Sequence, residues 1–249
     1  MKRTKVFFSI FMCFILLISI ITPNTLVFAD SNFQQSAVPN SSVKALQIYP
    51  SIPQLPDWAE AYGQGAVTCD AVSIEEFNET PDIIWDYDVI AIGFWDCNNH
   101  KDITAESKEV IIQYIDAGYG ALFGHDTVYE PACPNLWDLR NYVKLSTSDI
   151  GTDFHYNVKI RKEGLLTSYP NQLGTVGTVL RVPPTHDQSQ DALGNIWITF
   201  SKSEHAYLST WNHCGYIQTG HSNEEVTEAE QKIAINTLYY LAQRTTSAS

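Results

Sequence analysis

The chain has 249 residues and a formal net charge of −13, because 28 acidic side chains outnumber 15 basic ones. This balance argues against nucleic acid and anionic membrane surfaces as partners, since both would repel the chain. About 220 residues follow an N-terminal signal, which is enough for one α/β domain with a sizeable core.

The first 29 residues have the parts of a secretory signal peptide. A basic start over 2–5 precedes an apolar run over 6–21, and small residues precede a cleavage site after Ala29. Cleavage removes three basic residues and no acidic one, so the exported chain has a net charge of −16. The polar break at 22–25 argues against an uncleaved N-terminal anchor. We therefore expect a protein that is secreted or associated with the cell surface, without a transmembrane segment after cleavage.

Four cysteines remain after cleavage: Cys69, Cys97, Cys133 and Cys214. An oxidising exterior permits two disulfides among them, in three possible pairings that the sequence does not rank. Cys97 and Cys133 both lie a few residues after a predicted strand, so these two could meet near one edge of the sheet. No pair has a close Cys-x-x-Cys spacing, which argues against a structural zinc site.

The exported chain begins with a flexible leader over 30–42, rich in Ser, Asn and Gln, and one domain over 43–243 follows. The domain opens with a predicted strand over 43–49 and a short helix over 58–62. Alternating apolar and polar residues over 66–77 predict a second strand.

A strand, helix, strand unit over 87–127 is the centre of the predicted sheet. The continuous apolar run 89–95 is typical of a strand buried on both faces. Thr104 is in the N-cap position of a helix that ends at Gly118, and a second short apolar run over 121–123 follows. This pattern predicts two parallel strands joined by a crossover helix.

The middle of the chain is harder to interpret. A helix is predicted over 134–143, with Trp137 and Tyr142 on its buried side. Gly, Pro, Asp and Ser then interrupt the stretch 146–209 repeatedly, so we interpret it as an irregular insertion or lid. Two segments in it predict strands, 176–182 and 196–200.

The last part of the domain predicts a strand over 216–219 and a long helix. Thr227 and Glu230 have the spacing of a capping box at the start of this helix. The helix that follows has an apolar face made of Ile233, Ala234, Leu238, Leu241 and Ala242. Residues 244–249, after the helix, resemble a linker-like tail.

Polar side chains follow three strands of the predicted sheet. Asp96 follows one strand, His125 and Asp126 follow the next, and His221 follows the last. The carboxyl ends of neighbouring parallel strands meet at one edge, where α/β sheets bind their ligands. A single histidine at a strand end more often only hydrogen-bonds the backbone, but two histidines with carboxylates beside them favour a functional site.

Three motifs together resemble a known family. These are the strand 87–92 before a helix, Gly124-His125-Asp126 after the next strand, and Gly220-His221-Ser222 before the last helix. They are similar to the class I glutamine amidotransferase-like fold, in its ThuA-like (trehalose-utilisation-like) branch, over most of residues 43–243. The resemblance implies an α/β fold with a doubly wound, mainly parallel sheet of flavodoxin-like type, extended by an irregular insertion.

The resemblance also shows where this chain departs from the family. Amidotransferases have a nucleophilic cysteine after the strand, whereas this chain has His125 there, and Cys133 is too far along to replace it. Glutaminase activity is therefore not expected, because that acyl transfer needs a thiolate. His221 matches the family's catalytic histidine, and Glu224 or Glu225 matches its glutamate only with a shift in spacing.

We expect His125, Asp126 and His221 to act as one catalytic unit, either in acid–base chemistry or as ligands of a divalent metal. Since a solvated cleft contributes little to the core, replacing either histidine should leave the melting temperature nearly unchanged. Substrate-binding roles are predicted for Asp96, Trp95, Tyr129 and Glu224. Further aromatic residues that could stack on a sugar are Trp137, Trp211 and Tyr216.

Two classes of function remain. The first is a secreted hydrolase or carbohydrate-modifying enzyme that uses the His/Asp site. The alternative is a catalytically silent glycan-binding or cell-surface module, and both would take a small-molecule or glycan ligand. A stoichiometric metal in the purified protein would favour the enzyme.

Overall fold

A computed structural model provides the structure of the chain. It describes residues 42–94, 101–125, 127–128, 133–145, 149–189, 194–203, 205–219 and 226–245. These ranges belong to one compact unit that spans residues 39–249. The predicted signal peptide over 1–29, and the leader as far as residue 41, lie outside the described residues.

The described strands form one nine-stranded sheet in the order β2-β1-β3-β4-β9-β8-β7-β5-β6. Its first five strands are parallel to one another. They are β1 (Val43–Tyr49), β2 (Val67–Ser73), β3 (Val89–Ile92), β4 (Gly120–Phe123) and β9 (Cys214–Ile217). The four core strands expected from the sequence are therefore confirmed as neighbours. In this register Ile92 lies beside Phe123 and Phe123 beside Tyr216, so the carboxyl ends of β3, β4 and β9 are aligned.

The other half of the sheet is antiparallel and comes from the stretch that we expected to be irregular. It is made of β5 (Asp149–Ile160), β6 (Val179–Ser189), β7 (Asn195–Phe200) and β8 (Ala206–Trp211). The strand predicted over 196–200 is confirmed as β7. The strand predicted over 176–182 covers only the start of the edge strand β6, which continues through Pro183 and Pro184. Proline is tolerated there because an edge strand has no partner for half of its backbone N–H groups.

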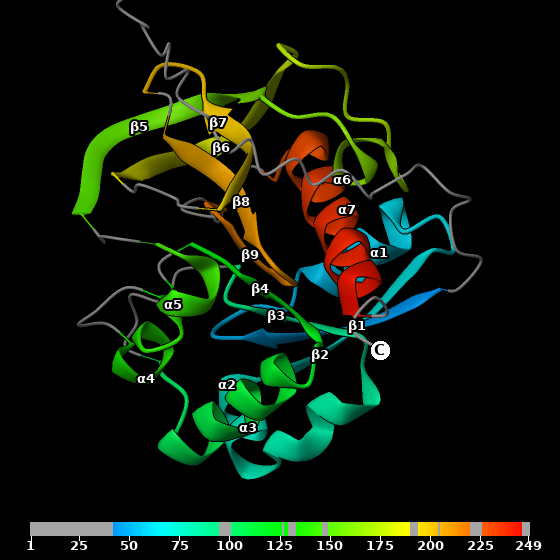
Figure 1. Cartoon of the computed structure of the whole chain (residues 1–249), viewed down its shortest axis with the longest axis vertical. Helices are drawn as coiled ribbons and strands as arrows, with labels where there is room; N and C mark the ends of the chain where they lie inside the picture. Colours follow the sequence, from blue (N-terminus) through cyan, green and yellow to red (C-terminus); the bar gives the residue numbers. More distant parts are fainter. Residues whose placement is uncertain are drawn as a thin grey trace, which may run out of the picture. The chain divides into compact units, whose positions relative to one another are not determined.

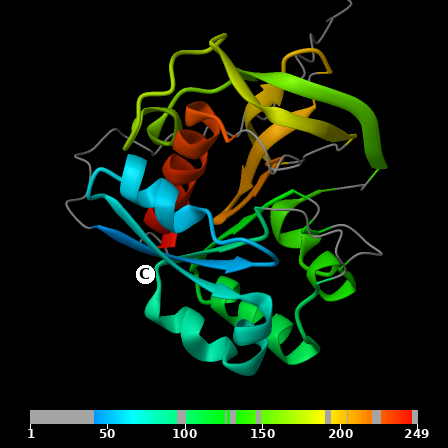
Figure 2. The same ribbon diagram turned by 180° about the vertical axis from the view of Figure 1, so that it is seen from behind.

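Helices cover both faces of the sheet (Figures 1 and 2). One face carries α1 (Leu55–Tyr62), α6 (Leu165–Ser168) and the central helix α7 (Glu228–Thr245). The other carries α2 (Ile74–Glu79), a 3₁₀ helix η1 (Pro81–Asp86), α3 (Ala105–Asp116), α4 (Pro134–Trp137) and α5 (Arg140–Val143). The layered α/β architecture expected from the sequence is confirmed. No helix in the described ranges is both long and apolar enough to cross a membrane.

Two predicted elements end earlier than the sequence suggested. The strand predicted over 66–77 stops at Ser73, because Ser73 forms a capping box with Glu76 and starts α2. The helix predicted over 134–143 is divided into α4 and α5. Its buried side chains are Leu136, Leu139 and Val143, and not Trp137 and Tyr142, which are only partly buried.

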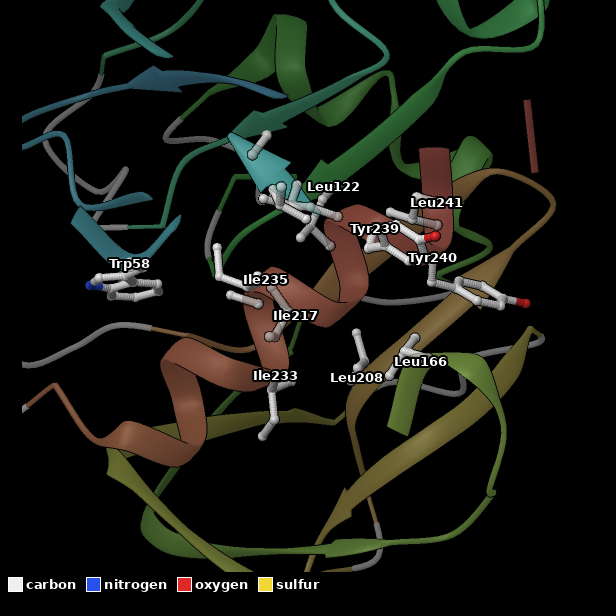
Figure 3. Packing of buried hydrophobic residues seen from close by; sticks show 14 of the residues in the cluster. Trp58, Leu122, Leu166, Leu208, Ile217, Ile233, Ile235, Tyr239, Tyr240 and Leu241 are labelled. Carbon is white, nitrogen blue, oxygen red and sulfur yellow. The ribbon is translucent and has the colours of Figure 1, made fainter. Parts of the chain in front are cut away.

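Helix α7 is buried on almost all sides (Figure 3). Its predicted apolar face is confirmed, and Ile235, Tyr239 and Tyr240 on its other sides are buried as well. A helix that is hydrophobic all round belongs to the interior of a protein. The cluster around it includes Trp58 of α1, Leu122 of β4, Leu166 of α6, Leu208 of β8 and Ile217 of β9.

One polar residue of α7, Asn236, is fully buried and fully hydrogen-bonded. Its Oδ1 accepts hydrogen bonds from Asn171 N at 2.9 Å and Asn171 Nδ2 at 3.0 Å. Its Nδ2 donates to Leu166 O at 2.9 Å and to Asn171 O at 2.7 Å. Asn236 therefore joins the central helix to α6 and to the loop that follows it.

The expected framework of two disulfides is not found. Cys69 and Cys214 are free thiols, and Cys133 donates a hydrogen bond from its Sγ to Lys101 O at 3.2 Å. Two disulfides among four cysteines would require at least one bond among these three residues. Cys97, the remaining cysteine, lies outside the described residues.

Candidate functional site

The corner that follows β4 carries His125, the one predicted site residue that the structure describes. It is packed tightly against the corner after β3. A Cβ atom at Gly124 would lie 2.4 Å from Phe94 N. A Cβ atom at Gly93, where φ is +88°, would lie 2.1 Å from Thr127 Oγ1. Only glycine fits these two positions, so the backbone holds His125 just past the carboxyl end of β4.

The His125 side chain is completely buried and lies next to a residue that follows β9. Its Nδ1 is 3.2 Å from Oε1 of Gln218. An amide oxygen can only accept a hydrogen bond, so Nδ1 carries the hydrogen in this arrangement. In the neutral ring Nε2 is then the basic nitrogen, which can accept a proton or bind a metal. The predicted position of His125 at the carboxyl edge is confirmed, but the predicted solvated surroundings are wrong.

The other predicted site residues lie outside the described residues. These are Asp126 and His221 of the catalytic unit, and Asp96, Trp95, Tyr129 and Glu224 of the substrate-binding set. The strands that precede them, β3, β4 and β9, are adjacent. Joint action of His125, Asp126 and His221 stays a prediction. Within the described ranges, no three His, Cys, Asp or Glu side chains are close enough together to hold a metal ion.

Several buried polar groups at the same edge have no hydrogen-bond partner in the described structure. They are the side-chain atoms Gln218 Nε2 and Thr219 Oγ1 after β9, Tyr207 OH on β8 and Ser201 Oγ after β7. Tyr207 is the strand neighbour of Gln218, because Gln218 N donates to Tyr207 O at 2.8 Å. Each buried group without a partner destabilises the fold by roughly 1–3 kcal/mol. Such groups gathered at one edge are typical of a ligand site.

A buried carboxyl group, that of Glu230 in the first turn of α7, was not among the predicted site residues. Burial raises its pKa to about 8, and its charge contributes to the raised pKa of Tyr207. Glu230 N donates to Thr227 Oγ1 at 3.2 Å, as the predicted cap requires. A signal was available in the sequence. Glu230 is three and four residues before Ile233 and Ala234, so helical spacing places it on the buried face.

The described thiols do not replace the missing nucleophile. Burial raises the pKa of Cys69 on β2 to about 12, and it also raises the pKa of Cys214. Cys214 begins β9 and is therefore at the edge opposite His125. Neither residue is a thiolate at neutral pH, so neither has the reactive form of a nucleophilic cysteine.

We expect the protein to release no ammonia from glutamine, because the corner after β4 has a histidine where a thiolate is required. Alkylation of the folded protein with iodoacetamide should leave any other activity largely intact. The measurement is ammonia release before and after alkylation. Complete loss of an activity on alkylation of Cys97 or Cys133, with the fold retained, would show that the nucleophile is elsewhere.

Comparisons with known proteins identify the fold. No protein-family model and no curated protein matches the sequence. A ThuA-like protein from Bacteroides uniformis superposes with a TM-score of 0.57 at 14% identity, over 84% of this chain and 95% of that one. A ThuA-like protein from Parabacteroides merdae gives 0.52 at 12% identity, over 81% and 90%. PurLQS from Thermotoga maritima gives 0.51 at 13% identity, over 81% and 100%.

At these identities the similarity establishes the fold and not the activity. The chain shares the layered α/β fold of these ThuA-like proteins and of PurLQS, which confirms the α/β fold expected from the sequence. The antiparallel strands β5–β8 continue the same sheet beyond β9.

Proposed function

We propose that this chain is a secreted or cell-surface hydrolase or carbohydrate-modifying enzyme, with an amidotransferase-like fold but no glutaminase chemistry. The observation that carries the proposal is His125. It occupies the corner after β4, and Gln218 holds its ring in the tautomer whose Nε2 can accept a proton. Proton transfer by a positioned histidine contributes typically 10²- to 10⁴-fold to a reaction rate.

The buried polar groups around this corner support a ligand rich in oxygen atoms. Gln218 Nε2 is a donor without a partner in the described structure, and Thr219 Oγ1 and Tyr207 OH each have a hydroxyl hydrogen to donate. A substrate with hydroxyl or carbonyl oxygens would satisfy these donors. Hydrogen bonds to these buried donors would contribute to the affinity for such a ligand.

The two titratable groups of this edge suit opposite halves of a proton transfer. His125 can accept a proton at Nε2 in the tautomer that Gln218 holds, while the carboxyl group of Glu230, with its pKa of about 8, remains protonated at neutral pH. Enzymes typically have one group that holds its proton and another that can accept one at the same pH. Asp126 and His221 complete the proposed catalytic unit, and Asp96, Trp95, Tyr129 and Glu224 the proposed substrate contacts.

The test is hydrolysis of a panel of 4-nitrophenyl glycosides and esters by the native chain and by His125→Gln. Glutamine keeps most of the side-chain volume and can still bond to Gln218, but it cannot accept the proton. We expect kcat to fall at least 100-fold. Metal content is measured on the same samples, because a stoichiometric transition metal would give His125 a ligand role.

Because His125 is buried, its replacement will also lower stability, and a control must separate the two effects. Phe77→Leu removes buried volume from α2, which packs against β1 and β2. It should lower the melting temperature and leave kcat unchanged. Full turnover by His125→Gln would contradict the proposal. Binding of these glycosides without hydrolysis would instead favour a catalytically silent glycan-binding module.

A further inference from the structure

A pocket lies at the edge of the sheet opposite His125, where the parallel strands begin. Its volume is about 350 Å³. The end of α3, the end of α5 and the turn between β8 and β9 form its walls. Trp211 pairs with Cys214 at the start of β9, so the sheet separates this pocket from His125. The prediction that Trp211 could serve the same site as His125 is therefore wrong.

The three walls of this pocket are joined in pairs by side-chain contacts. His213 Nε2 in the turn donates to Ile115 O of α3 at 2.7 Å. Tyr142 OH of α5 donates to Asp116 Oδ1 of α3 at 3.2 Å. Lys144 Nζ, after α5, lies 5.5 Å from the centroid of the Trp211 ring. The walls are thus held in place before any ligand binds, which reduces the entropy lost on binding.

The groups that line the pocket combine an aromatic surface with hydrogen-bonding side chains. Trp211 is 37% exposed, although cores normally bury tryptophan. Asp116, Asn141 and Asn212 are exposed and line the same pocket. The negative charge of Asp116 and the positive charge of Lys144 cancel in the net charge of the lining. The pocket therefore does not favour a strongly charged ligand.

We propose that this pocket binds one or two rings of a neutral saccharide. The apolar C–H face of a sugar ring stacks on the exposed indole of Trp211, while Asp116 and the amides of Asn141 and Asn212 bond to its hydroxyl groups. The volume is near the lower end of the range for ligand pockets, roughly 300–1,000 Å³, which suits a short saccharide. The site is independent of the proposed chemistry at His125, and it would hold the protein on a glycan.

The test titrates the full chain with methyl α-D-glucopyranoside, N-acetyl-D-glucosamine, maltose and cellobiose. Binding is followed by calorimetry and by the indole N–H resonances of ¹⁵N-labelled protein. We expect at least one sugar to shift the Trp211 resonance saturably, with a dissociation constant on the order of 1 mM for so small a ligand. Trp211→Ala should weaken this binding at least tenfold, and Asp116→Asn should weaken it several-fold.

Trp85→Ala is the matched control, because Trp85 is equally exposed at 37% and does not line the pocket. It should leave the dissociation constant within about twofold of the native value. His125→Gln should also bind as the native chain does, so the outcome here is separate from the outcome of the turnover assay. The proposal is wrong if none of the four sugars shifts the Trp211 resonance. It is equally wrong if Trp211→Ala and Asp116→Asn both bind as tightly as the native chain.

Discussion

Replacement of Asn236 by alanine is expected to lower the free energy of unfolding by roughly 3–5 kcal/mol. The buried amide makes four hydrogen bonds, and alanine leaves Leu166 O, Asn171 O and Asn171 N without this partner inside the protein. For a domain of this size the melting temperature should fall by about 10 °C. Thermal unfolding followed by circular dichroism measures the change.

A control on the same helix separates this network from a general effect of alanine. Lys232, one turn earlier, forms an ion pair with Glu228 near the surface, and Lys232→Ala should change stability by less than about 0.5 kcal/mol. Asn171→Ala removes only one of the four bonds, the one from Asn171 Nδ2, because Asn171 N and Asn171 O belong to the backbone. The double variant Asn171→Ala/Asn236→Ala should therefore lose less than the sum of the two single losses only by that one shared bond. Equal losses for Lys232→Ala and Asn236→Ala would show that the network contributes little.

Whereas Asn236→Ala should destabilise the protein, Glu230→Gln is expected to stabilise it in alkaline solution. The pKa of this carboxyl group rises from 4.5 to about 8 on burial. Between these values the folded chain holds a proton that the unfolded chain releases, so native stability falls as the pH rises through this window. The fall is about 1.4 kcal/mol per pH unit and amounts to a loss on the order of 5 kcal/mol above pH 8.

Glutamine does not titrate, so Glu230→Gln should escape this loss. Its melting temperature should exceed that of the native chain at pH 9 and approach it near pH 5. Glu228→Gln, at the exposed start of the same helix, should show no such gain. If Glu230 has a function, the stabilised variant should also lose turnover, since a destabilising buried charge is retained mainly where activity needs it. If the melting temperatures of Glu230→Gln and the native chain differ by the same amount at pH 5 and at pH 9, the raised pKa of Glu230 is wrong.

The parallel half of the sheet could be predicted because each of its strands is visible locally. A short apolar run ends at a glycine or a polar residue in β3 and β4, and Thr104 caps the helix between them as expected. The antiparallel half is visible only in part, because the segments 176–182 and 196–200 predict parts of β6 and β7 whereas β5 and β8 were not predicted. Strand β6 contains two prolines, and the pairing of β5 with β6 shifts register twice, so neither alternation nor continuous hydrophobicity persists.

The candidate site could be predicted only in part, for a similar reason. His125 was found because it directly follows a recognisable strand. Gln218 and Tyr207 were missed because their roles depend on pairings between distant segments. The contact between His125 and Gln218 joins residues 93 positions apart, and Tyr207 meets Gln218 only through the antiparallel pairing of β8 with β9. Such pairings cannot be read from local patterns.

The position of α7 determines when this protein can fold during its synthesis. All nine strands precede the helix in the sequence, yet the hydrophobic cluster on one face of the sheet is built around it. Until residues 228–245 have left the ribosome, Leu122, Leu208 and Ile217 have no helix to cover them. Without α7 the apolar side chains on this face of the sheet lack the helix that buries them, and exposed apolar surface of this kind favours aggregation. Closure of this core therefore waits for the synthesis of α7, the element that follows all of the described strands.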